Sequence, residues 1–281
     1  MGDVDVTIET GTINTGHGWV SFSQTTGNGP PVLMIHGNSS CRDVFRHQLN
    51  SELGATHRVI TFDLPGHGES DDARDPHRSY TQPAYAEAAV EVLRALGAED
   101  AVVMGWSLGG HIGIEMISRL PSMRALTFSG TPPSGPGAAE VNAAFTPQPH
   151  MAFTSKEVFS QEDADNYARY TCGVDLPPDP VLSAAVKRTD GKARQIMWTR
   201  WTEEGLGCPQ RKTVESWDRP IAVIQGSDEA FFDNCFLDGI AWRNLWGGKV
   251  HVIDGGGHAP FWAKPAEYNE IFSRFLGELT G

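Results

Sequence analysis

The chain has 281 residues, 40% of them hydrophobic, which is enough to bury a full core in one domain that carries an insertion. Its 35 acidic residues outnumber the 22 basic ones, so the formal net charge is −13, and the basic residues form no run. Nucleic acids and anionic membrane surfaces are therefore excluded as expected partners, because a protein of this charge repels both.

The N-terminus lacks the features of a targeting segment. The sequence MGDVDVTIET has acidic residues where a signal peptide is basic, and Val6 breaks the myristoylation pattern. No apolar run approaches the roughly 18 residues of a spanning helix. Cys41, Cys172, Cys208 and Cys235 are far apart, which predicts free thiols and neither a disulfide framework nor a zinc site. We expect a cytoplasmic monomer or homodimer that needs no cofactor.

Short strand-like runs recur along the chain, and most are β-branched and apolar on both faces, as in a buried sheet. They are Trp19–Ser23, Pro31–His36, Arg58–Asp63, Ala101–Gly105, Arg124–Ser129, Pro220–Gln225 and Lys249–Ile253. Helical patterns lie between them, at Val44–Leu53, Gln82–Leu96, Leu108–Leu120 and Ala266 to about Leu279. This alternation predicts an α/β fold, with a mostly parallel central sheet flanked by helices on both sides.

The alternation stops after Ser129, where the sequence GTPPSGPGAAE is dense in glycine and proline, and it resumes at Pro220. The segment between is rich in aromatic residues and methionine, as a cover over an apolar pocket would be. It contains short helical patterns at Lys156–Tyr170, Pro180–Lys187 and Ala193–Trp201. We predict a helical cap at residues 136–216, inserted into a core formed by residues 1–135 and 217–281.

A candidate nucleophile follows the predicted strand Ala101–Gly105. Gly105-Trp106-Ser107-Leu108-Gly109 has the G-x-S-x-G pattern and joins that strand to a helix. The turn of this motif is tight, and the two glycines remove side chains that would collide across it. We predict that Ser107 is exposed at the carboxyl edge of the sheet and acts as the nucleophile.

A serine hydroxyl needs a base to take its proton and an acid to orient that base. His258, in a glycine-rich loop after the last predicted strand, is the expected base. Gly226-Ser227-Asp228-Glu229 offers two carboxylates after the preceding strand. The G-x-x-D spacing common in serine hydrolases selects Glu229, and Asp228 stays open as the alternative acid because either carboxylate can hold the histidine.

Negative charge on the substrate oxygen needs backbone donors, usually from the residue after the nucleophile and from a loop after an early strand. Leu108 and Asn38 hold these positions, Asn38 in the sequence HGNSS, and its side chain is also a candidate substrate contact. We assign the DLPGHGES loop at residues 63–70, including His67, to structure. His111 is also assigned to the core, because it lies one turn into the helix after Ser107.

With these motifs in order, the chain resembles the α/β-hydrolase superfamily over nearly its full length. It is most similar to the metal-independent N-acylhomoserine lactone lactonases, quorum-quenching enzymes that open the homoserine lactone ring. The likeness rests on MIHGNSS, FDLPGHGES, GWSLGGHIGIEMI, SGTPP, YARYTCG, RTDGKAR and HVIDGGGHAPF. It implies Ser-His-acid hydrolysis of a small-molecule ester and a cap tyrosine beside the lactone, Tyr167. The expected pocket also includes Gly37, Trp106, Met151 and Trp198.

The cap departs from the lactonases in GLGCPQRK and in Trp198 and Trp201, which leaves acyl length and ring size open. Esterases of large macrocyclic lactones, such as macrolide antibiotics, and general carboxylesterases are therefore alternatives. Metal-dependent lactonases are excluded, because the sequence has no H-x-H-x-D-H cluster. A lactone receptor without catalytic activity is the alternative from another class, since such a receptor can keep the three catalytic residues.

Overall fold

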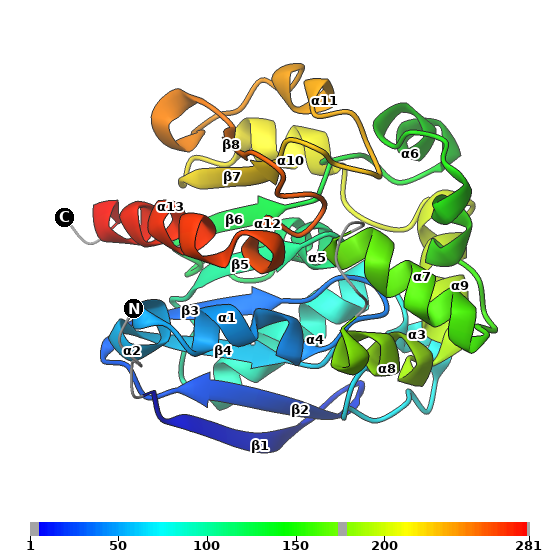
Figure 1. Cartoon of the computed structure of the whole chain (residues 1–281), viewed down its shortest axis with the longest axis horizontal. Helices are drawn as coiled ribbons and strands as arrows, with labels where there is room; N and C mark the ends of the chain where they lie inside the picture. Colours follow the sequence, from blue (N-terminus) through cyan, green and yellow to red (C-terminus); the bar gives the residue numbers. More distant parts are fainter. Residues whose placement is uncertain (1–5, 174–178, 280–281) are drawn as a thin grey trace.

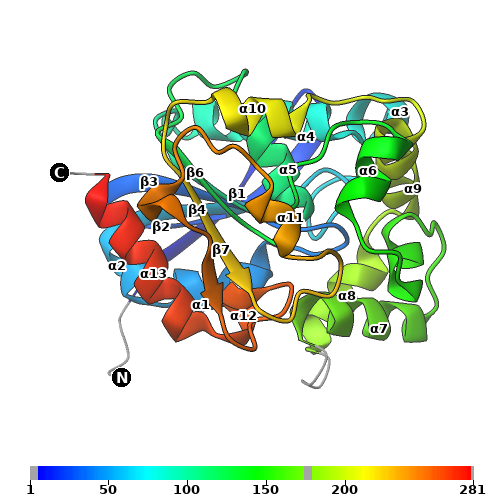
Figure 2. The same ribbon diagram turned by 90° about the horizontal axis from the view of Figure 1, so that it is seen from above.

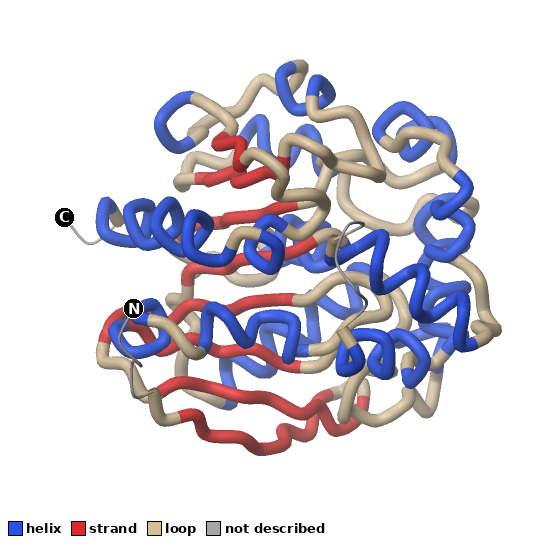
Figure 3. The backbone as a smooth tube through the Cα atoms, in the orientation of Figure 1, coloured by secondary structure: helices blue, strands red, loops and turns tan. Residues whose placement is uncertain are grey.

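Residues 6–173 and 179–279 are described by the computed structural model. Its centre is one eight-stranded sheet in the order β1-β2-β4-β3-β5-β6-β7-β8 (Figure 1, Figure 3). The pairs β1–β2 and β2–β4 are antiparallel, and all pairs from β4 to β8 are parallel. The predicted α/β fold with a mostly parallel sheet is confirmed.

The seven predicted strands are all present, each within two residues of the expected bounds. The strands are β1 (Ile8–Thr15), β2 (Gly18–Thr25), β3 (Gly29–Ile35), β4 (His57–Phe62), β5 (Val102–Trp106), β6 (Ala125–Ser129), β7 (Ile221–Gly226) and β8 (His251–Ile253). Strand β1 was not among the predicted strands. This strand lies at the edge of the sheet and most of its residues are exposed, so it lacks the apolar pattern of the central strands.

Helices cover both faces of the sheet (Figure 2). The face that carries α1, α12 and α13 is opposite the face that carries α4, α5 and α10 (Figure 1, Figure 2). The core helices are η1 (Arg42–Phe45), α1 (Arg46–Leu49), α2 (Glu52–Thr56), α3 (Pro76–Ser79), α4 (Gln82–Ala95), α5 (Leu108–Met116), α10 (Gln210–Ser216), α11 (Cys235–Asp238), η3 (Trp246–Gly248), α12 (Pro260–Ala263) and α13 (Pro265–Glu278).

The single helix predicted at Val44–Leu53 is wrong, because the segment forms η1, α1 and the start of α2 instead. Ser51 has an extended backbone and caps α2, where its Oγ accepts a hydrogen bond from the N–H of Leu53. A serine or asparagine inside an apolar pattern often starts a new helix in this way.

The cap helices gather at the end of the sheet where the parallel strands terminate (Figure 1, Figure 2). They are α6 (Ala138–Ala144), η2 (Pro149–Thr154), α7 (Gln161–Cys172), α8 (Pro180–Arg188) and α9 (Gly191–Thr202). The predicted limits of the cap remain a prediction, and we would place α10 with the core because it packs on α5. Residues 1–5 and 280–281 of the predicted core and 174–178 of the predicted cap lie outside the described residues.

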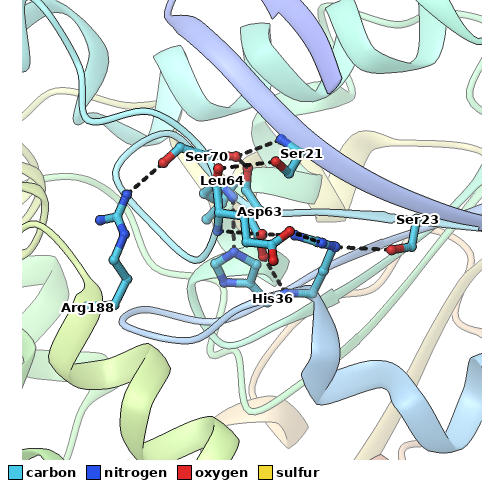
Figure 4. A network of polar contacts seen from close by, with 9 residues as sticks. Ser21, Ser23, His36, Asp63, Leu64, Ser70 and Arg188 are labelled. Carbon is cyan, nitrogen blue, oxygen red and sulfur yellow. Dashed lines mark hydrogen bonds and ion pairs between the residues drawn. The ribbon is translucent and has the colours of Figure 1, made fainter. Parts of the chain in front are cut away.

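The loop after β4 is held by the buried carboxylate of Asp63 (Figure 4). Its oxygens accept hydrogen bonds from the backbone N–H groups of Arg42 and Glu69 at 2.7 and 2.9 Å, and they pair with the Arg42 guanidinium. The Ser70 hydroxyl donates to the Asp63 carbonyl at 2.6 Å. The loop is thereby fixed against η1, which accords with the structural role expected for it.

His36 connects this loop to the loop that carries Asn38 (Figure 4). The N–H of Leu64 donates to His36 Nε2 at 3.0 Å, so Nδ1 carries the proton and donates to the Gly37 carbonyl at 2.7 Å. Burial lowers the pKa of His36, so the ring is neutral at physiological pH. Two loops that are far apart in sequence are thus held together at the edge of the sheet.

The turn between β5 and α5 leaves no space for side chains beside the backbone. A Cβ at Gly105 would lie 2.2 Å from the Gly109 carbonyl oxygen, and a Cβ at Gly109 would lie 2.0 Å from the Ile35 carbonyl oxygen. Backbone atoms cannot move aside cheaply, so β3, β5 and α5 approach this closely only because both positions are glycine.

We predict that Gly109→Ala lowers the free energy of unfolding by about 2 kcal/mol or more, because the new methyl group overpacks the turn. The matched control is Gly277→Ala in α13, where a Cβ meets nothing within 4 Å and helix propensity favours alanine by about 0.5–1 kcal/mol. Urea unfolding measures both variants. Equal midpoints for the two would contradict the packing argument.

Candidate active site

A narrow cavity of about 40 Å³ lies between the cap and the carboxyl ends of the central strands. Its walls are mainly apolar and aromatic, with a few polar groups that converge on one space, as in small-molecule sites. The lining residues are Asn38, Gln82, Ser107, Leu108, His111, Phe145, Met151, Thr154, Tyr167, Met197, Trp198, Trp201, Phe231 and His258. Seven of the predicted site residues are among them: Asn38, Ser107, Leu108, Met151, Tyr167, Trp198 and His258.

Ser107 stands on the turn between β5 and α5 with a positive φ of 53°. The backbone around it is fixed, because its N–H donates to the Ser129 carbonyl at 2.9 Å. Its own carbonyl accepts bonds from the Gly110 N–H and the Thr131 hydroxyl, both at 2.9 Å. The half-buried Ser107 side chain is held at the floor of the cavity.

The His258 ring is held by a carboxylate and by two aromatic rings. Its Nδ1 lies 2.7 and 2.9 Å from the two carboxylate oxygens of Glu229, and both side chains are almost fully buried. The rings of Trp106 and Phe231 lie beside it, with centroids at 5.8 and 4.3 Å. Because Nδ1 faces the carboxylate, Nε2 is the ring nitrogen left for proton exchange in the cavity.

Glu229 is also fixed by its own partners. It accepts hydrogen bonds from Gln225 Nε2 at 2.8 Å and from the Phe231 N–H at 2.9 Å. The alternative acid, Asp228, is exposed and accepts a hydrogen bond from the Gly257 N–H at 2.8 Å. The carboxylate that contacts His258 is therefore that of Glu229, while Asp228 holds the loop before the histidine.

The two expected oxyanion donors line the cavity beside Ser107. Leu108 is the first residue of α5, where backbone N–H groups have no partner within the helix. The side chain of Asn38 already has a hydrogen-bond partner in the cap, since its Nδ2 donates to the Thr154 carbonyl at 2.9 Å. The backbone N–H of Asn38 thus remains the candidate donor, and its side chain holds the cap in place.

Tyr167 reaches the cavity from α7, where it packs against Phe153 and Phe159 at centroid distances of 5.8 and 5.9 Å. Burial raises the pKa of Tyr167, so its hydroxyl stays protonated and can donate a hydrogen bond. Met151 on η2 and Trp198 on α9 also line the cavity.

The structure corrects the expected contacts of Trp106 and Gly37 with substrate. Trp106 is 1% exposed, packs on Phe261 and donates from Nε1 to the His258 carbonyl at 2.9 Å. As the last residue of β5, it points into the layer under the site and supports the histidine loop. Gly37 contributes space, because a Cβ there would lie 3.2 Å from the Ser107 Cβ.

Trp201, expected to alter the pocket wall, also lines the cavity. Six lining residues were not predicted: Gln82, His111, Phe145, Thr154, Met197 and Phe231. His111 was assigned to the core, yet it lines the cavity one turn after Ser107, and this i, i+4 spacing was the available signal. Its Nδ1 lies 2.6 Å from Gln210 Oε1. Burial lowers the pKa of His111 to about 4, opposed by the Gln210 hydrogen bond and aided by the nearby His258.

No group of three or more His, Cys, Asp or Glu side chains in residues 6–173 and 179–279 is arranged to hold a metal ion. In that same part of the chain, no helix has the length and apolar character needed to cross a membrane. The four cysteines are free thiols.

Comparison with known proteins identifies the family. A family model for the alpha/beta hydrolase fold matches residues 30–265. Structures of N-acyl homoserine lactonase AidH, in complexes with N-hexanoyl homoserine and with N-butanoyl homoserine, are 47% identical to the chain. The first superposes with a TM-score of 0.93 over 98% of both chains, and the second with 0.92 over 97% of both.

More distant relatives agree with this result. A pimeloyl-[acyl-carrier protein] methyl ester esterase of Xanthomonas campestris is 28% identical over 90% of this chain and 97% of its own length. An uncharacterised protein of Mycobacterium tuberculosis is 25% identical over 97% and 82%. The protein is a carboxylic ester hydrolase, and it belongs to the α/β hydrolase fold family. The predicted resemblance to the N-acylhomoserine lactone lactonases is confirmed.

We predict that Glu229→Gln lowers kcat/KM for an activated ester by about 10³- to 10⁴-fold, because the amide no longer stabilises the charged imidazole. Asp228→Asn keeps an oxygen acceptor for the Gly257 N–H and should lose less than about tenfold. Steady-state kinetics on p-nitrophenyl butyrate compares the two. A larger loss in the Asp228 variant would reverse the assignment of the acid.

His111 should make the fold sensitive to acid. The pKa of His111 is about 4 in the folded protein and about 6.5 in the unfolded chain. Neutral His111 therefore stabilises the fold fully above pH 6.5, and this contribution is lost as the pH falls towards 4. The free energy of unfolding falls by at most about 3 kcal/mol through this protonation. His111→Asn keeps a donor for Gln210 without this titration, so its unfolding free energy should fall less between pH 7 and pH 4.5 than that of the wild type. Parallel pH profiles for the two proteins would refute the prediction.

Proposed function

We propose that the protein opens the ring of N-acylhomoserine lactones by Ser-His-acid chemistry without a metal. The observation that carries this proposal is the buried Glu229–His258 pair in the cavity that also holds Ser107. The 47% identity to a lactonase that was solved with acyl homoserines supports this substrate class.

In the proposed mechanism His258 Nε2 takes the proton of Ser107, and the alkoxide attacks the lactone carbonyl. The N–H groups of Leu108 and Asn38 stabilise the negative oxygen, while ionised Glu229 stabilises the imidazolium. His258 then protonates the ring oxygen as its bond to the carbonyl breaks. Water attacks the acyl-enzyme and gives its proton to His258, which returns a proton to Ser107 as the open-chain acid leaves.

The cap side chains would bind the rest of the substrate. The protonated hydroxyl of Tyr167 is a candidate donor to the lactone oxygens. Apolar walls from Met151, Met197 and Trp198 suit an acyl chain. The cavity is narrow, about 40 Å³, so a small lactone would displace fewer cap side chains than a macrolide ring.

Hydrolysis of a simple carboxylic ester is the second candidate. It is favoured by the similarity to a methyl ester esterase over 90% of the chain, and it would use the same three side chains. A lactone receptor without catalytic activity is disfavoured by the similarity over nearly the whole chain to a lactonase and to a methyl ester esterase.

The proposal predicts rapid opening of N-butanoyl and N-hexanoyl homoserine lactones, unchanged by a chelator and reduced about 10⁴-fold or more in Ser107→Ala. Mass spectrometry of a panel that includes a methyl ester and a macrolide measures each product. If the homoserine lactones stay intact while the methyl ester is cleaved, the protein is a general carboxylesterase and the lactonase proposal is wrong. Activity that vanishes with chelator would contradict the metal-free mechanism.

A further inference from the structure

One corner of the cavity is polar although the walls beside it are apolar. It is formed by Gln82 at the start of α4, His111 on α5 and Trp201 on α9, and all three line the cavity. Gln210 on α10 lies behind them and is fully buried. The three lining side chains are between 2% and 4% exposed, so their polar atoms depend on partners inside the protein.

A chain of hydrogen bonds orients these groups. His111 Nδ1 bonds Gln210 Oε1 at 2.6 Å, and Gln210 Nε2 donates to Gln82 Oε1 at 3.0 Å. The His111 and Trp201 rings lie in contact, with centroids 4.9 Å apart. With its oxygen engaged by Gln210, Gln82 presents its amide N–H groups as donors.

Two buried donors in this corner have no hydrogen-bond partner among the described residues, namely Gln82 Nε2 and Trp201 Nε1. Buried N–H groups are nearly always satisfied, because losing water without gaining a partner is costly. Both donors belong to side chains that line a ligand cavity, so a bound ligand is a natural partner for them.

We propose that Gln82 and Trp201 form a subsite for an oxygen acceptor on the acyl chain, the 3-oxo or 3-hydroxyl group of an N-acylhomoserine lactone. This inference rests on the proposed lactonase function and makes the substrate class narrower. The side chains of the corner are neutral, and burial keeps His111 uncharged at physiological pH. A carboxylate would therefore be desolvated without a counter-charge, which favours a neutral oxygen.

The spacing of residues along α5 agrees with an oxygen at C3 of the acyl chain. His111 follows Ser107 by four residues, which is about 6 Å along a helix axis. In an extended N-acylhomoserine lactone, C3 of the acyl chain lies about five bonds, or roughly 6 Å, from the scissile carbonyl carbon. The amide carbonyl lies closer to the reacting bond, whereas C3 lies about as far from it as His111, which contacts Trp201, lies from Ser107.

The test compares N-octanoyl with N-(3-oxooctanoyl) homoserine lactone, which differ only in the C3 oxygen. The wild type should favour the 3-oxo compound about tenfold in kcat/KM, as expected for one or two net hydrogen bonds. Gln82→Met and Trp201→Phe remove one donor each, and each should reduce that ratio to about threefold or less. Trp242→Phe is the control, because it removes an indole N–H donor that lies outside the cavity lining and bonds the Leu237 carbonyl, and it should leave the ratio unchanged.

The ratio within each variant corrects for any general loss of stability or rate. Equal kcat/KM for the two lactones in the wild type, or a ratio that survives both Gln82→Met and Trp201→Phe, would overturn the subsite.

Calorimetric titration of Ser107→Ala with the same two compounds separates this inference from the proposed function, since no turnover is needed. If the wild type opens neither lactone, the proposed function is wrong. The ratio of the two Kd values then tests the subsite independently of catalysis. Tighter binding of the 3-oxo compound by about tenfold supports it. Equal Kd values, or binding of neither compound, would overturn it.

Discussion

The backbone at Ser107 is the constraint on which the rest of the structure depends. Its φ of 53° with ψ of −118° is a conformation that a side chain rarely adopts, at a typical cost of about 1–3 kcal/mol. The surrounding sheet holds it there: β6 accepts the Ser107 N–H, and Thr131 binds the carbonyl. Because β5 lies between β3 and β6, the strained residue has supporting strands on both sides.

The cap is bound to the active-site loop by a buried cation. The Arg194 guanidinium donates to two backbone carbonyls of the cap at 2.8 and 3.0 Å and lies 4.0 Å from the Phe159 ring centroid. It also donates to Ser39 Oγ at 3.2 Å, beside Asn38, whose own side chain bonds the Thr154 carbonyl. Carbonyl dipoles and a ring face replace the lost water around the charge. The cap and the loop with the oxyanion donor are therefore mechanically one unit.

Features that depend on a few adjacent residues were predictable from the sequence, and features that depend on distant segments were not. The turn at Ser107 and the loop at His258 have local motifs, and the counting rule that chose Glu229 over Asp228 matches the carboxylate that contacts the histidine. The cavity wall is different, since Gln82 precedes the cap in sequence and Phe231 follows it, and they line one cavity only after folding. The misplaced contact of Trp106 has the same origin, because its direction depends on which layer covers β5.

Helix α9 connects substrate selection to catalysis. Arg194, Trp198 and Trp201 are spaced i, i+4 and i+7, so they lie along one face of the helix. The first binds the loop that carries Asn38, and the other two form the cavity wall. A ligand that displaces either tryptophan would therefore also move α9, and α9 holds the loop that carries the oxyanion donor Asn38. Changes to the acyl wall on this helix should therefore alter kcat together with KM.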